Sequence, residues 1–113
     1  MILGTPEKAI PMLEQSERDF PDDYNPPARL ALAYKELKEY DKALAASDRA
    51  LARVYGPRKI TVLRARADIY TAKGDKEGAK RTIQEAIAYA KSLPDGQRSE
   101  RTIAALEKRL ETL

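Results

Sequence analysis

A short segment recurs three times along this chain, and its spacing limits the fold more than any other feature. The copies lie at residues 4–10, 38–44 and 74–80, and each carries an alanine at its sixth position. These alanines are Ala9, Ala43 and Ala79, so successive copies are 34 and 36 residues apart. A proline follows each copy, at Pro21, Pro57 and Pro94. Such a period indicates a protein built from stacked supersecondary units.

Hydrophobic spacing and helix-end signals predict that these units are helical. Leu30 and Tyr34 recur at helical spacing, and no segment alternates with period two for long enough to form a strand. Gly74-Asp75 is expected to end one helix and cap the next, while Asn25-Pro26 should start another. The six helices that we predict span about residues 6–20, 25–38, 41–54, 58–73, 76–92 and 98–112.

One residue conflicts with this pattern. Pro11 falls inside the first predicted helix, where proline removes a backbone donor and its ring clashes with the carbonyl of Glu7. The cost in a regular helix interior is about 3 kcal/mol. We therefore expect a kink at Pro11, or a helix that begins near Met12.

Two further motifs recur 36 residues apart, Leu30-Ala31-x-x-Tyr34 and Arg66-Ala67-x-x-Tyr70. With the alanines and the closing prolines, they make nearly the whole chain resemble the tetratricopeptide repeat family, whose unit is a helix–turn–helix of about 34 residues. The resemblance implies an all-α fold, a right-handed α-solenoid of antiparallel helical hairpins, that serves as a protein–protein interaction scaffold. The chain departs from the family pattern at Pro27, Leu63, Arg66 and Ser47, so no particular binding specificity is implied.

We expect a single domain over residues 1–113. Within it, residues 1–22 would be the second half of a truncated repeat, and residues 24–57 and 60–94 two further repeats. Residues 97–113 would form a capping helix, since Ile103, Leu106 and Leu110 lie on one helical face. Because the chain starts in mid-repeat, we interpret it as a fragment of a longer protein.

The composition argues against catalysis. The chain has no cysteine and no histidine, which removes the thiolate nucleophile, the commonest acid–base catalyst and the usual zinc ligands. No motif with the spacing of a cofactor or metal site is present. The net charge of +3 is too balanced to indicate nucleic acid, and no apolar run could span a membrane. We predict no enzyme activity, cofactor or metal, and a cytoplasmic protein that binds neither nucleic acid nor membrane.

The resemblance places a binding groove on the first helix of each repeat. Its residues follow from helical phase, because Leu30, Ala31 and Tyr34 should face the core and leave a neighbouring stripe outside. We predict that Leu32 gives a partner apolar contact while Arg29 and Arg64 hold carboxylates. The full set of predicted groove residues is Asn25, Arg29, Leu32, Lys35, Glu36, Thr61, Arg64, Asp68 and Thr71. Asp68 stands where family members that grip chaperone tails need a neutral amide, which disfavours that ligand.

A different class of function competes with groove binding. No helix within the chain would cover the apolar residues of the first segment, leaving an open N-terminal edge at Ile2, Leu3, Ile10 and Leu13. Such an edge could pair with a second copy of the chain, as a homodimer, or dock another domain of the same protein. Ile10→Glu should then abolish the pairing.

A second, weaker resemblance concerns residues 25–31 and 55–59. These segments look like the repeat tails that follow thioredoxin-like domains in some bacterial proteins, although no residue of a redox motif is present. The resemblance implies that the chain is one part of a larger bacterial protein, with any enzymatic activity in another part.

Overall fold

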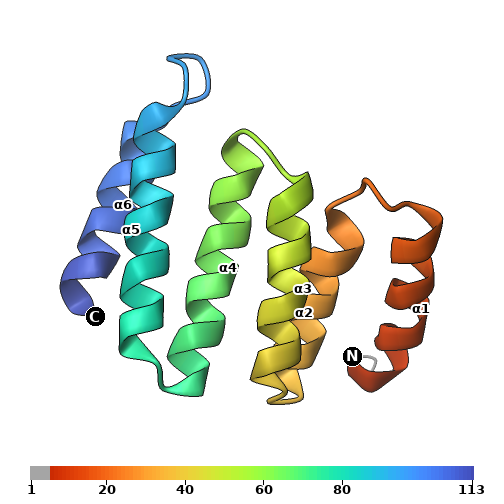
Figure 1. Cartoon of the computed structure of the whole chain (residues 1–113). Helices are drawn as coiled ribbons and strands as arrows, with labels where there is room; N and C mark the ends of the chain where they lie inside the picture. The colour runs from red at the N-terminus through yellow and green to blue at the C-terminus, as the bar shows by residue number, and fades with distance from the viewer. Residues whose placement is uncertain (1–5) are drawn as a thin grey trace. The chain divides into compact units, whose positions relative to one another are not determined.

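The computed structural model describes residues 6–113 and contains six α-helices in that range (Figure 1). No described residue lies in a β-strand. The predicted all-α fold is therefore confirmed, and each predicted helix end lies within two residues of the observed one. The helices are α1 (Pro6–Asp19), α2 (Asn25–Glu36), α3 (Tyr40–Arg53), α4 (Pro57–Lys73), α5 (Lys76–Ser92) and α6 (Glu100–Thr112).

The chain divides into two compact units, with the boundary between Val54 and Tyr55. In the first unit α2 and α3 form a tightly packed hairpin and α1 packs against α2. In the second unit α4 and α5 form the corresponding hairpin and α6 packs against α5. Each unit is therefore one helical hairpin with one flanking helix.

Buried alanines bring the helices of each hairpin close together. Ala43 and Ala79, two of the aligned alanines of the repeated segment, have no exposed surface, and neither do Ala46 and Ala50 on α3. Ser47 is buried with them, and its hydroxyl donates a hydrogen bond to the carbonyl of Leu44 at 2.8 Å. A small hydroxyl residue thus satisfies its own polar group at a place where a larger side chain would hold the helices apart.

Helix α1 runs without interruption through Pro11, from Pro6 to Asp19. Of the two alternatives predicted for Pro11, a helix that begins near Met12 is wrong, and a kink at Pro11 stays a prediction. Because Pro11 is exposed at only the sixth position of the helix, the missing backbone donor affects the first turns alone, and the residues that follow retain their hydrogen bonds.

Helix α2 starts with a different cap from the one predicted. Asn25 is the first residue of the helix, not its cap, and the residue before it, Tyr24, makes no side-chain capping bond. The carboxylate of Asp23 instead accepts hydrogen bonds from the backbone N–H of Asn25 at 2.9 Å and from its side-chain amide at 3.1 Å. Pro26 follows within the first turn, where its missing N–H costs nothing.

The turn between α4 and α5 has the predicted signals at the predicted residues. Gly74 ends α4 in the left-handed conformation, with φ of 88°, and the Asp75 carboxylate accepts a hydrogen bond from the backbone N–H of Gly78 at 2.9 Å. In the equivalent turn between α2 and α3 the left-handed residue is Lys38, with φ of 62°. Glycine adopts this conformation without the steric cost that a lysine bears.

In the first unit, an ion-pair cluster ties α1 to α3. Glu17 accepts a hydrogen bond from Arg49 Nε at 2.8 Å and lies 2.9 Å from Arg53 Nη2. Its side chain is only 14% exposed. The hydrogen bond from Arg49, aided by the charges of Arg49 and Arg53, lowers the pKa of Glu17 below its ordinary value of 4.5, against the opposing effect of burial. Because α1 has no fully buried residue, this cluster is a large part of its attachment.

The cluster predicts how stability depends on pH. Because the folded state lowers the pKa of Glu17, the stabilisation is complete above the ordinary value of 4.5 and is lost as the pH falls through the lower, folded-state pKa. Glu17→Gln should destabilise the first unit by about 1 kcal/mol at neutral pH. Urea unfolding followed by circular dichroism should show this difference shrinking in acid. Glu85→Gln, at an exposed site on α5, is the matched control, and a pH-independent difference at Glu17 would contradict the assignment.

Gly78 predicts a second stability effect. An added Cβ at this buried glycine would overlap the ring of Tyr70 on α4 and crowd the capping carboxylate of Asp75. Gly78→Ala should therefore lower the free energy of unfolding by about 1–3 kcal/mol, even though alanine has the higher helix propensity. Gly96→Ala, where an added Cβ has no neighbour within 4 Å, should be nearly neutral in the same denaturation experiment.

Candidate functional site

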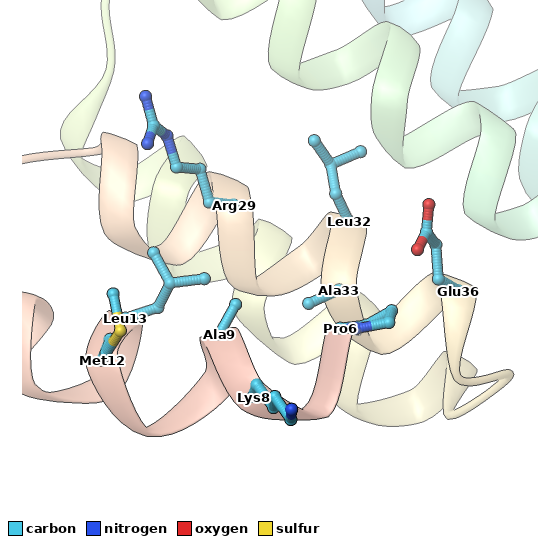
Figure 2. Close-up of a pocket in the computed structure, with 9 residues that line it drawn as sticks. All are labelled: Pro6, Lys8, Ala9, Met12, Leu13, Arg29, Leu32, Ala33 and Glu36. Atoms are coloured by element: carbon cyan, nitrogen blue, oxygen red, sulfur yellow. The ribbon is translucent and has the colours of Figure 1, made fainter. Parts of the chain in front are cut away.

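A pocket of about 520 Å³ lies between α1 and α2 in the first unit (Figure 2). Each helix forms one side of the pocket, and charged residues of α2 lie at its two ends. The lining residues are Pro6, Lys8, Ala9, Met12 and Leu13 of α1 and Arg29, Leu32, Ala33 and Glu36 of α2.

The surface of this pocket is mainly apolar and partly open to solvent. Ala9 and Ala33 contribute little more than a methyl group each, while Leu13 and Leu32 provide the larger contacts. Leu32 is 50% exposed and Met12 is 71% exposed, both high for large apolar residues. A patch of this kind marks a candidate contact site for another molecule.

Charged groups stand at the rim of the pocket. Figure 2 shows Arg29 and Glu36 at opposite ends of the α2 side, with Leu32 between them. Neither side chain makes an ion pair or hydrogen bond to any residue in the described range 6–113. No described residue therefore neutralises either charge.

The structure brings together residues that the sequence assigned to two separate sites. Arg29, Leu32 and Glu36 come from the predicted groove set, whereas Leu13 comes from the predicted N-terminal edge, and all four line one pocket. Ile10, from the edge set, is half-buried on α1 and does not line it. Ile2 and Leu3 lie outside the described residues.

The remaining predicted groove residues are not among those that line this pocket. Asn25 and Lys35 are on α2, and the Asn25 amide is engaged with Asp23. The other four residues are on α4, in the second unit, and all of them are exposed: Thr61, Arg64, Asp68 and Thr71. The hydroxyl of Thr71 donates to the carbonyl of Ala67, within its own helix.

The charge of Asp68 is paired within the second unit. Arg109 of α6 donates a hydrogen bond to the Asp68 carboxylate at 2.5 Å. The positive charge of the last helix thus offsets the negative charge on the exposed face of α4. Repulsion of a ligand carboxylate by Asp68 is correspondingly weaker than the sequence alone predicts.

Sequence reasoning missed the α1 side of the pocket. Pro6, Lys8, Ala9 and Met12 line it, yet of the α1 residues in the lining only Leu13 was named as part of a site. A signal was present, because Ala9, Met12 and Leu13 have the spacing of residues that share one helical face. Their pairing with Leu32 on α2 depends on the packing of two helices, which that spacing does not reveal.

Other kinds of site find no support among the described residues. Within residues 6–113 no group of three or more histidine, cysteine, aspartate or glutamate side chains could hold a metal ion. A search of the same residues finds no helix long and apolar enough to cross a membrane. No buried side-chain nitrogen or oxygen in this range lacks a hydrogen-bond partner.

Antiparallel helical hairpins with an exposed apolar and charged face define a helical-repeat protein. A family model for the tetratricopeptide repeat matches residues 24–92, which include all of α2 to α5. The chain belongs to the tetratricopeptide repeat family, and the predicted resemblance is confirmed. Repeats of this family generally mediate protein–protein interactions.

The other comparisons add no relatives. Neither the comparison with curated proteins nor that with solved structures gives a match. The similarity to repeat tails of thioredoxin-like proteins receives no support from these comparisons. The family match ends before α6 and begins after α1, so the pocket lies where a helix inside the match meets one outside it.

Proposed function

We propose that the chain is a protein-interaction module that binds a polypeptide segment at the α1–α2 pocket. The observation that carries the proposal is the exposed Leu32, which lies beside small apolar residues and between Arg29 and Glu36, two charges with no partner among the described residues. An apolar contact with charges on either side is the usual composition of a polypeptide-binding surface.

The exposed face of α4 is a second element of the proposed binding function. Thr61 and Arg64 are exposed there, and the guanidinium of Arg64 suits a carboxylate ligand because it can donate two parallel hydrogen bonds. The pairing of Asp68 with Arg109 removes part of the repulsion that such a ligand would meet. We propose a binding role without catalysis, since the chain has neither histidine nor cysteine.

Leu32→Glu tests the pocket. A library of displayed peptides would be selected on the unmodified protein, and each selected peptide would be titrated against both proteins by fluorescence anisotropy. We expect Leu32→Glu to weaken binding at least about tenfold, because burial of a leucine side chain is worth about 1.5–3 kcal/mol and a glutamate must be desolvated in its place.

Ala88→Glu is the control for this experiment. It makes the same change of charge at an exposed alanine on α5, in the other unit, and should leave the affinity unchanged. Circular dichroism would verify that both variants fold. Selected peptides that bind the unmodified protein and Leu32→Glu equally well would refute the pocket as the site.

Self-association through the N-terminal edge is the second candidate function, and the exposure of Met12 favours it. If α1 pairs two copies of the chain, sedimentation equilibrium should show a concentration-dependent dimer. Met12→Glu should then shift the protein to monomer, because a carboxylate would be buried at the contact. Met12 is a cleaner test than Ile10, whose half-buried side chain also packs within the unit. A monomer at every concentration would exclude this function.

A further inference from the structure

The two charges at the rim of the α1–α2 pocket have a spacing that a ligand can match. Arg29 and Glu36 are seven residues apart on α2, and two helical turns separate them by about 10.5 Å along the axis. Leu32 and Ala33 lie between them, one turn from Arg29. The α2 side of the pocket therefore presents positive charge, apolar contact and negative charge in that order.

An α-helix fits this order better than an extended segment. In a helix lying along α2, residues i and i+7 would face the two charges, and residues i+3 and i+4 would face the apolar centre. An extended segment covers the same 10.5 Å in about three residues, which leaves no pair of adjacent side chains for the centre. Ala9 and Ala33 also allow the close approach, about 8–10 Å between axes, of a packed helix.

The second unit shows a helix held in this way. On α6, Ile103 and Leu106 are buried, Glu107 lies 3.5 Å from Lys91 of α5, and Arg109 pairs with Asp68 of α4. An apolar stripe with an acidic and a basic residue beside it thus seats one helix of this chain on others. The α2 side of the pocket in the first unit offers the same chemistry, with Arg29 and Glu36 unpaired among the described residues.

We infer that the ligand of the α1–α2 pocket is an amphipathic helix with an acidic residue at position i, apolar residues at i+3 and i+4, and a basic residue at i+7. The inference rests on the proposed polypeptide-binding function and adds the class and direction of the ligand. An acidic N-terminus and a basic C-terminus also stabilise an isolated helix through its dipole. Because its acidic residue pairs with Arg29 and its basic residue with Glu36, the bound helix lies parallel to α2, with its N-terminus at Arg29.

A spin-labelled peptide tests the direction of binding. The probe is an alanine-based helical peptide with Glu, Leu-Leu and Lys at these positions and a nitroxide at its N-terminus. Because the protein has no cysteine, the peptide carries the only label. In NMR spectra of the protein, the label should broaden the amide signals around Arg29 more than those around Glu36. Exchanging the two charges, in the Arg29→Glu/Glu36→Arg double variant, should reverse this pattern.

Affinity provides the second readout. A peptide with glutamate at both charged positions and one with lysine at both should each bind about three- to tenfold more weakly than the matched peptide. The double variant Glu39→Lys/Lys42→Glu is the control, because it exchanges the charges of an exposed ion pair elsewhere on the first unit and should leave both direction and affinity unchanged.

The outcomes separate this inference from the function on which it rests. Binding that depends on Leu32 but shows no reversal in the charge-exchanged variant overturns the inference and leaves polypeptide binding intact. Selected library peptides that bind through Leu32 while the helical peptide does not bind would overturn it in the same way. Loss of all Leu32-dependent binding removes the proposed function itself. Peptide-independent dimers that cover the pocket would assign it to a second copy of the chain and also overturn the inference.

Discussion

Close contact between paired helices is the constraint on which the rest of this structure depends. At Ala43 and Ala79 the helices meet over side chains of one methyl group, and both residues are fully buried. At Gly78 the contact between helices is closer still, since the ring of Tyr70 occupies the space that a Cβ would need. A larger residue at any of these positions would separate the helices and forfeit the dispersion contacts along their whole length. The small residues of the repeated segment thus mark the positions at which the paired helices touch.

The flanking helices are attached by other means. Helix α1 contributes no fully buried residue, and α6 buries only Ile103 and Leu106. Ion pairs supplement these apolar contacts, with Glu17 joined to Arg49 and Arg53 at one end and Arg109 joined to Asp68 at the other. Charge pairs between helices fix position more than they add stability.

The pocket involves the first half of α1, whereas the Glu17 cluster attaches this helix near its C-terminal end. In its first half, α1 meets α2 through small and half-exposed side chains. Ala9 and Ala33 leave a hollow between the helices that Leu13 and Leu32 only partly fill. Arg29 and Glu36 stand at its two ends without a partner among residues 6–113, and their opposite charges give the pocket a direction as well as an apolar surface.

The sequence by itself determined the helices, because helix formation depends on local signals. Gly74 and Asp75 end one helix and cap the next without help from distant residues, and the alanine period sets which faces meet. Local signals were ambiguous at the start of α2, where Asp23 rather than Asn25 accepts the first hydrogen bonds, and at Pro11, which lies inside α1. Phase alone also identified Leu32, Arg29 and Glu36 as exposed.

Tertiary structure decided which residues lie beside these. The pairing of Asp68 with Arg109, and the joining of Leu13 to Leu32 in one pocket, link residues far apart in the chain. Such contacts depend on how whole helices pack against one another, and the spacing of apolar residues along a helix does not determine this packing.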